Sequence, residues 1–241
     1  MAASFITPIG VVVPAITADQ MREVDRVAIE EVGPNLFQMM ENAGRSLALT
    51  AIDMLGERWS VAPIVVLAGT GGNAGGGIAA ARHLANRGAD VTVVVTDARR
   101  LGRVPMAQLD VFGGTGGRVA GLSDVTEAQG LIIDAIIGYS LSGAPHGAAF
   151  EMIEWANAQA APVLALDVPS GLDSTTGAAP GAAVEATRTM TLALPKTGLD
   201  VTGGELWLAD LGIPAEVYRR VGVDVPSGLF GNRYRVALRP V

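Results

Sequence analysis

Short apolar runs alternate with longer stretches of helical periodicity from Ala62 onward. The apolar runs are continuous rather than alternating, which is typical of strands that are covered on both faces of a sheet. The sequence predicts strands over residues 63–68, 91–96, 131–137, 162–166, 189–194 and 205–209. Helical stretches such as 77–87 and 149–159 separate them. This order of strand, loop and helix predicts a mostly parallel sheet with right-handed crossovers.

Two helical segments precede this block and predict a helical N-terminal lead-in. Thr17 and Gln20 have the spacing of a capping box. The apolar positions that follow fall on one helical face; they are Met21, Val24, Ala28, Ile29 and Val32. Gly33 and Pro34 interrupt the pattern, and residues 35–55 predict a second, longer helix. Because no repeat or linker divides the chain, residues 1–241 are predicted to form one three-layer α/β/α domain.

The amino-acid composition and charge exclude several classes of protein. The chain has 241 residues, of which 49% are hydrophobic and 17% are charged, so a disordered protein is excluded. It has no cysteine and two histidines, which leaves too few ligands for a zinc site. The net charge is −7 and basic residues do not cluster, so we expect no nucleic-acid partner. The apolar runs are too short for a bilayer and no basic residue precedes the first one, so we expect no membrane partner and a cytoplasmic location.

The first loop that is a candidate ligand-binding site follows the strand predicted at 63–68. Ligands of open parallel sheets bind beyond the carboxyl ends of the strands. Six of the nine residues from 69 to 77 are glycine, and a helix follows. Such a loop allows close backbone approach and presents free N–H groups to an anion. The spacing fits neither a dinucleotide fingerprint nor a P-loop, and a plain glycine turn stays an alternative.

Two later strands carry acidic residues, one within the strand and one at its end. Asp134 interrupts an apolar strand, where a carboxylate must be paired, hydrogen-bonded or bound to a cation. Asp167, Ser170 and Asp173 share one tight turn after the strand at 162–166. Oxygen atoms this close together suit a hard cation or a ribose hydroxyl. Structural capping of the loop backbone is the alternative in both places.

Six ordered segments resemble the YjeF N-terminal domain family of NAD(P)H-hydrate epimerases over about residues 17–214. The family's Met-Glu-Asn-Ala-Gly segment is similar to residues 40–44, and its glycine loop and Ala-Arg-His-Leu helix to residues 69–84. The D-x-x-x-G loop corresponds to residues 134–138, and D-[IV]-P-S-G-[VL]-D to residues 167–173. Residues 195–199 and 210–214 resemble two later segments.

The resemblance implies a Rossmann-like fold, a homodimer and epimerisation of the R and S forms of hydrated NADH and NADPH. It implies a potassium ion held by Asn73, Asp134 and Ser170, and a separate NAD(P)HX dehydratase as functional partner. The substrate-binding residues implied by position are Gly72, Asn73, Ala74, Gly75, Gly76, Gly138, Tyr139, Ser140, Leu141, Ser142 and Asp167. Inversion at C6 of the nicotinamide ring requires a positioned acid or base, and Asp134 is the candidate for this role.

Four positions depart from the family pattern. The family has Asn, Gly and Asp where this chain has Gly72, Ala74 and Gly76, and a second-loop glycine where it has Ser140. The absence of the loop carboxylate keeps two alternatives open. One is a catalytically silent scaffold for binding or dimerisation, and the other is an enzyme with the same pocket acting on another small molecule.

Overall fold

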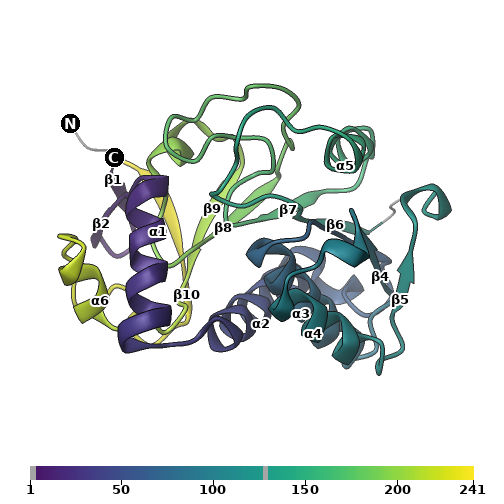
Figure 1. The fold of residues 1–241 in the computed structure, drawn as a ribbon, viewed down its shortest axis with the longest axis horizontal. Helices are drawn as coiled ribbons and strands as arrows, with labels where there is room; N and C mark the ends of the chain where they lie inside the picture. The colour runs from purple at the N-terminus through teal and green to yellow at the C-terminus, as the bar shows by residue number, and fades with distance from the viewer. Residues whose placement is uncertain (1–3, 127–129) are drawn as a thin grey trace.

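The computed structural model describes residues 4–126 and 130–241. Over these residues, ten strands form one sheet in the order β2-β1-β10-β9-β8-β7-β6-β3-β4-β5 (Figure 1). The strands are β1 (Ser4–Ile6), β2 (Val12–Pro14), β3 (Ile64–Ala68), β4 (Val91–Val95), β5 (Arg118–Ala120), β6 (Leu131–Ala135), β7 (Val163–Leu166), β8 (Arg188–Leu192), β9 (Glu205–Ala209) and β10 (Arg235–Pro240). Strands β3 to β9 run parallel, whereas β10, β1 and β2 join antiparallel at one edge.

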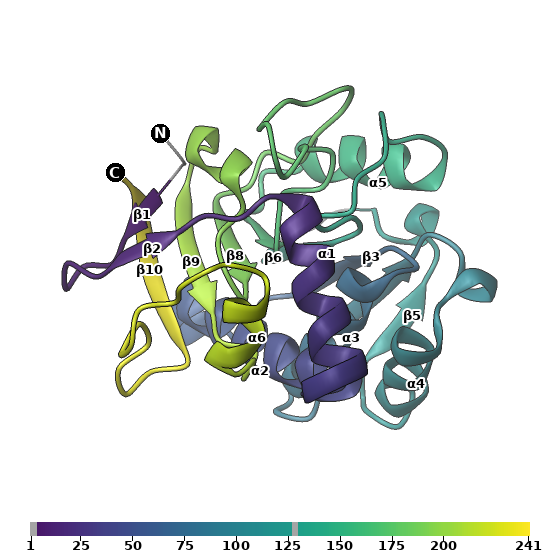
Figure 2. The ribbon, with the colours of Figure 1, turned by 60° about the vertical axis from the view of Figure 1, so that its left-hand side comes forward.

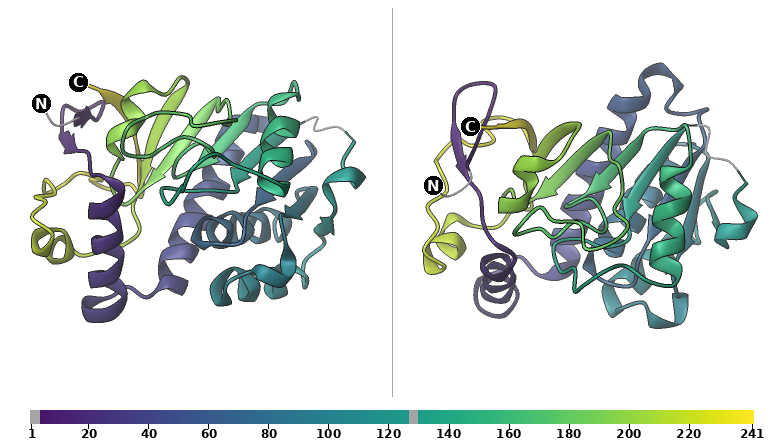
Figure 3. Two further views of the ribbon diagram at one scale, coloured as in Figure 1. Left: turned by 45° about the horizontal axis from the view of Figure 1, so that its top comes forward. Right: turned by 90° about the horizontal axis from the view of Figure 1, so that it is seen from above.

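The helices cover both faces of this sheet. They are α1 (Ala18–Val27), α2 (Leu36–Leu55), α3 (Gly72–Ala85), α4 (Arg103–Phe112), α5 (Ala148–Asn157) and α6 (Ala215–Arg220). Short helical turns lie at Ala28–Val32, Gly56–Arg58, Ala98–Arg100, Leu122–Asp124 and Thr197–Val201. Helices α2, α3 and α4 lie on one side of the sheet and α5 on the other (Figures 1 and 3). The predicted three-layer α/β/α fold is confirmed.

Two cores follow from this layering. Alternate residues of the central strands point to opposite faces. Ile64 and Val66 therefore join the large core that contains α1, α2 and α3, whereas Val65 and Leu67 pack with Met152 of α5. Both faces of each central strand are buried, which explains why the strands read as continuous apolar runs.

The six predicted strands are all present, with ends that differ by at most two residues. The sequence did not predict four of the strands, which are β1, β2, β5 and β10. Three of them are only three residues long, and β10 alternates with polar residues at the antiparallel side. The helical N-terminal lead-in is therefore itself preceded by the short hairpin of β1 and β2.

The first helix follows the prediction only in part. The Thr17–Gln20 capping box forms, and Met21, Val24 and Ala28 are buried. Ile29 and Val32 were expected on the same face, but they are 47% and 40% exposed. The reason is that a π-helical turn begins at Ala28, and its wider pitch rotates the following residues away from the core.

The glycine loop is shorter than predicted, because α3 begins at Gly72 rather than near Gly77. The prediction placed the helix later because glycine is unfavourable inside a helix by about 1 kcal/mol relative to alanine. The helical glycines lie where other elements leave no room for a side chain. A Cβ at Gly77 would lie 2.3 Å from the Cβ of Ala135 on β6. Tight contact between helix and strand therefore requires glycine there.

The chain direction across the sheet reverses at β3. From β3 the chain proceeds outward through β4 to β5, then returns to β6 on the other side of β3 and continues to β9. The loops after β3 and β6 therefore diverge at this switch point, where open α/β sheets form their ligand crevice. Figure 2 shows α1 in front of this region, between α6 and α3.

No helix in the described ranges 4–126 and 130–241 is both long and apolar enough to cross a membrane.

Replacing Gly77 by Ala should reduce the free energy of unfolding by about 1–3 kcal/mol, because the new methyl group overpacks the contact with Ala135. Urea denaturation measures this change. Gly116→Ala is the control, since no atom lies within 4 Å of a Cβ at that position. Equal stabilities for the two variants would contradict the role of close packing at Gly77.

Candidate functional site

A cavity of about 340 Å³ opens at the switch point of the sheet. Its walls come from α1, α2 and the start of α3, from the ends of β7 and β8, and from the segments that follow β3, β6, β7, β8 and β9. The lining residues are Met21, Asp25, Leu36, Met39, Met40, Thr70, Gly71, Gly72, Asn73, Gly76, Ile136, Ile137, Gly138, Tyr139, Ser140, Leu166, Asp167, Leu192, Lys196 and Leu211. The cavity thus combines an apolar interior with a few polar groups, as small-molecule sites do.

The structure brings most of the predicted substrate-binding residues to this cavity. Those that line it are Gly72, Asn73, Gly76, Gly138, Tyr139, Ser140 and Asp167. The others predicted for substrate, Ala74, Gly75, Leu141 and Ser142, are not among the lining residues. Ala74 is buried in the core, and Gly75 faces the side chain of Met40.

Gly76 is one of the positions that depart from the family pattern. A Cβ at this position would lie 2.8 Å from Cδ2 of Leu166 and 3.5 Å from the Cβ of Ala43. Leu166 and Ala43 thus occupy the space that a side chain at position 76 would need. The carboxylates that line the cavity come instead from Asp25 and Asp167.

Asp167 and Lys196 form a buried ion pair in the cavity wall. Asp167 is 3% exposed and Lys196 is 1% exposed. The Lys196 ammonium donates to Oδ1 of Asp167 and, at 2.9 Å, to the carbonyl oxygen of Leu192. Backbone N–H groups of Leu192 (3.3 Å) and Tyr139 (3.1 Å) donate to the same carboxylate. Both oxygen atoms of Asp167 are therefore held in place.

Asp167 also has an unusual backbone. Its φ of 70° lies in the left-handed region, which aspartate tolerates better than most residues. This conformation directly follows β7 and turns the chain at the edge of the sheet. Such conformations occur at functional sites, where the surroundings hold them in place.

Gly138 lies between two polar side chains of the site. A Cβ there would come within 3.1 Å of both Oδ1 of Asn73 and Oδ2 of Asp167. Any larger residue would separate the loop after β6 from these groups. The Asn73 amide meanwhile donates to the Leu166 carbonyl at 3.2 Å, so the start of α3 is tied to the end of β7.

Tyr139 connects the loop after β6 to α1. Its hydroxyl donates to Oδ2 of Asp25 at 2.6 Å, and the Lys196 ammonium lies 5.8 Å from the centre of its ring. Burial raises the pKa of Asp25, and the hydrogen bond from Tyr139 offsets part of that rise. Burial, together with the neighbouring Asp25 carboxylate, also raises the pKa of the Tyr139 phenol, so it stays a donor at neutral pH.

Asp134 and Ser170 form a second polar cluster, which does not belong to the cavity lining. Both side chains are fully buried. Asp134 accepts hydrogen bonds from the Ser170 hydroxyl (2.5 Å), the Ser170 backbone N–H (2.8 Å) and the Ile136 backbone N–H (3.2 Å). Burial raises the pKa of Asp134 to about 6, against the lowering effect of these hydrogen bonds. The aspartate thus caps the loops after β6 and β7.

The donor set near Asp134 suits a monovalent cation. Among the residues that the structure describes, no three His, Asp or Glu side chains come together as metal ligands. Asp134 offers a single carboxylate beside the neutral oxygens of the Ser170 hydroxyl and the Ile137 carbonyl, which lie 3.1 Å apart. Oxygen ligands with one negative charge fit a hard, singly charged ion such as potassium.

Sequence reasoning did not assign Asp25 and Lys196 to the site. A signal for each was present in the chain. Lys196 follows β8, so the rule about carboxyl ends of strands also applies to it. Asp25 is a charged residue between Val24 and Ala28 on the apolar side of α1, where a carboxylate requires a partner.

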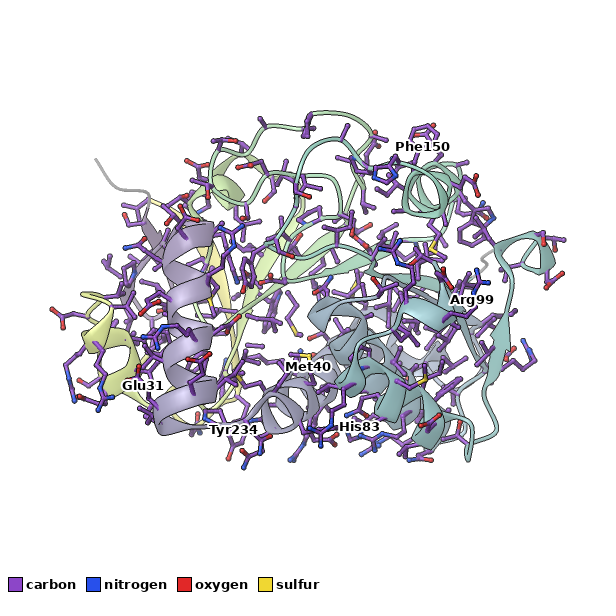
Figure 4. All side chains as sticks on the ribbon, viewed as in Figure 1. Glu31, Met40, His83, Arg99, Phe150 and Tyr234 are labelled. Carbon is purple, nitrogen blue, oxygen red and sulfur yellow. The ribbon has the colours of Figure 1, made fainter. Side chains whose placement is uncertain are left out.

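His83 has a structural role at the contact between α2 and α3. Its Nε2 lies 2.8 Å from Glu41 on α2, and the same carboxylate accepts from Arg82. Figure 4 shows His83 at the periphery of the molecule and Met40 toward its centre. His83 therefore joins α2 to α3 and does not line the cavity.

Replacing Lys196 by Met should reduce the free energy of unfolding by about 3–5 kcal/mol, because it leaves the buried Asp167 carboxylate without its cation. The double variant Asp167→Asn/Lys196→Met should lose clearly less, since it removes both charges. A double-mutant cycle from urea denaturation measures the coupling. Additive effects of the two substitutions would contradict the ion pair.

The sequence of this chain is similar to those of known proteins. The profile of the family described as YjeF-related protein N-terminus matches residues 36–198. A relative from Dehalogenimonas lykanthroporepellens, named NAD(P)H-hydrate epimerase, is 49% identical over 240 residues, which cover 99% of this chain and 98% of the relative. A second protein of that name, from Weissella koreensis, is 35% identical and covers 85% and 95%.

Two further comparisons concern architecture. The bifunctional NAD(P)H-hydrate repair enzyme of Salinibacter ruber is 37% identical over 86% of this chain, which spans only 42% of that longer protein. The crystal structure of yeast ynu0 superposes with a TM-score of 0.81, covering 92% of this chain and 99% of the yeast chain. At 21% identity that likeness concerns the fold alone. From its profile match and its close relatives, the chain belongs to the YjeF-related protein N-terminus family.

Proposed function

We propose that this protein is an isomerase that epimerises hydrated NADH and NADPH. The observation that carries the proposal is the 49% identity to an NAD(P)H-hydrate epimerase over nearly the whole length of both chains. The cavity at the switch point is consistent with it, since a nicotinamide ring needs an apolar slot with a few polar groups at its edge.

The cavity suits one end of a dinucleotide better than the whole molecule. Its volume of about 340 Å³ lies near the lower limit for small-molecule pockets. A shallow groove adjoins it and shares Leu36, Gly71 and Gly72 with its wall. The exposed Arg103 lines this groove. The nicotinamide ring would occupy the cavity, and the diphosphate and adenosine would extend along the groove toward Arg103.

Two side chains would hold the nucleotide by their polar atoms. Asp167, with both oxygens already fixed by Lys196 and backbone N–H groups, would accept a hydrogen bond from a ribose hydroxyl through a remaining lone pair. The first N–H groups of α3, at Gly72 and Asn73, have no side-chain cap and would donate to an anionic group. Gly138, Tyr139 and Ser140 would form the facing wall.

A potassium ion forms part of the proposal. Asp134, Ser170 and Asn73 would supply its side-chain oxygens. When bound, the ion would supply positive charge that stabilises the ionised form of Asp134. Asp134 and Ser170 would then hold the loops after β6 and β7 at a fixed separation behind the cavity.

The remaining parts of the proposal come from the family. We propose that the protein acts in the cytoplasm as a homodimer. The Salinibacter ruber relative is named as bifunctional, and the chain matches 42% of it. A separate NAD(P)HX dehydratase would therefore complete the repair of the hydrated cofactor.

The test supplies a mixture of R and S hydrated NADH together with a dehydratase that accepts only the S form. We expect the whole mixture to return to NADH, faster than spontaneous epimerisation allows. Absorbance of NADH follows the reaction. Recovery that stops at the S fraction, with a folded protein, would exclude the epimerase and leave the silent scaffold or another substrate.

Potassium should raise the thermal stability at neutral pH, because an ion that binds only the folded state stabilises it by mass action. Saturation to about 100 times the dissociation constant corresponds to about 2.7 kcal/mol. The melting temperature is measured in potassium chloride and in N-methylglucamine chloride of equal ionic strength.

Asp134→Asn should abolish the difference between the two salts. Asp173→Asn is the matched control, because Asp173 caps the backbone of Thr175 and Thr176 in the neighbouring turn and should leave the potassium response intact. An equal response in wild type and Asp134→Asn would argue against potassium at this place.

A further inference from the structure

The three carboxylates near the cavity differ in how much hydrogen-bonding capacity is left to them. Asp134 is fully buried, does not line the cavity and already accepts three hydrogen bonds. Asp167 is ion-paired with Lys196, and both of its oxygens accept hydrogen bonds. Asp25 lines the cavity, and its Oδ1 accepts no hydrogen bond from any residue of 4–126 or 130–241. Only Asp25 therefore combines contact with the cavity and a free oxygen.

The hydrogen bond from Tyr139 fixes this carboxyl in one orientation. The phenol donates to Oδ2 of Asp25 at 2.6 Å, which leaves Oδ1 as the atom available to a ligand. Tyr139 is itself held, because its backbone N–H donates to Asp167 at 3.1 Å. Met21, one turn earlier on α1, lines the same wall. Asp25 and Asp167 thus approach the cavity from different elements and are linked through one tyrosine.

The surroundings of Asp25 favour proton exchange. The half-buried position raises its pKa, and the Asp167 carboxylate adds to this rise, whereas Tyr139 and the Lys196 ammonium oppose it. The titratable and charged groups that act on Asp25 or its hydrogen-bond partner are Tyr139, Lys196, Asp167, Arg22 on the same helix and Tyr218 on α6. A raised pKa increases the fraction of the carboxyl that carries a proton at a given pH and makes its carboxylate a stronger base, as an acid–base residue requires.

We propose that Asp25 is the acid–base residue of the epimerisation and that Tyr139 is its positioning residue. This inference rests on the proposed function. It replaces Asp134, the candidate from the sequence, which lies outside the cavity lining and already accepts three hydrogen bonds.

In this reaction Asp25 gives one proton to the substrate and receives one back. The Asp25 carboxyl gives its proton to the hydroxyl on C6, the C6–O bond breaks, and water departs. The lone pair of the ring nitrogen forms the N1=C6 double bond. A water molecule then forms a new C6–O bond from the opposite face, and its surplus proton returns to the Asp25 carboxylate through water in the cavity. The reaction involves no oxidant or reductant, and C6 differs only in configuration.

Asp25→Asn should lower kcat by about 10²–10⁴-fold, the range for loss of a general acid or base, and leave KM within a few-fold of wild type. The coupled assay with S-specific dehydratase measures both constants, after subtraction of spontaneous epimerisation. Asp19→Asn is the matched control, because Asp19 lies on the same helix with its side chain 91% exposed. It should keep wild-type rates.

Tyr139→Phe tests the positioning role through the pH dependence of kcat, which a purely structural role of Tyr139 would leave unchanged. The protonated form of Asp25 starts the reaction, so kcat falls as pH rises through its pKa. The tyrosine hydroxyl stabilises the carboxylate, and its removal therefore raises this pKa. The alkaline limb of the kcat–pH profile should shift to higher pH in Tyr139→Phe, with activity retained at lower pH.

Each outcome decides the inference. Wild-type kcat in Asp25→Asn overturns it, and so does an unshifted limb in Tyr139→Phe. Loss of kcat in a folded Asp25→Asn protein, together with the shifted limb, supports it. If Asp25→Asn fails to fold, Tyr139→Phe alone decides. A wild-type protein with no epimerase activity overturns the proposed function and this inference together, whereas an active wild type with an active Asp25→Asn overturns the inference alone.

Discussion

The buried ion pair between Lys196 and Asp167 is the interaction on which the site depends. A lone charge at either position would be unfavourable in the core, so each residue requires the other. The pair joins the chain after β7 to the chain after β8, and Asp167 also receives the backbone N–H of Tyr139 from the loop after β6. Three consecutive strands in the sheet order thus meet at one carboxylate, which fixes the cavity wall.

Close packing of α3 supplies the second constraint. The helix contacts β3, β6 and β7 as well as α2 and α4. At Gly77 the contact with β6 leaves no space for a side chain. Interiors of this density transmit small changes in volume, so the start of α3 has a fixed position relative to the loops it faces. The uncapped N–H groups at Gly72 and Asn73 therefore reach the cavity without a flexible loop between them.

The polar groups of the site divide into two layers with different chemistry. Asp134 and Ser170 lie behind the cavity lining and tie two loops together, which suits a structural cation. Asp25, Tyr139, Asp167 and Lys196 line the cavity and form one connected chain of hydrogen bonds and charge contacts. Gly76 also lines the cavity, and there Leu166 and Ala43 occupy the space that a side chain would need.

The sequence by itself determined the α/β class, the six inner strands, the capping box at Thr17, the position of Asp134 inside an apolar strand and the turn that begins at Asp167. These features depend on local periodicity and on the rule that parallel strands gather their carboxyl ends at one edge. Only the tertiary structure decided the helical start of α3, the exposure of Ile29 and the separation of Asp134 from the cavity. It also decided the contacts of Asp25 and Lys196 with residues 114 and 29 positions away. The physical reason is that burial and pairing of a charge depend on contacts between elements that local sequence patterns do not record.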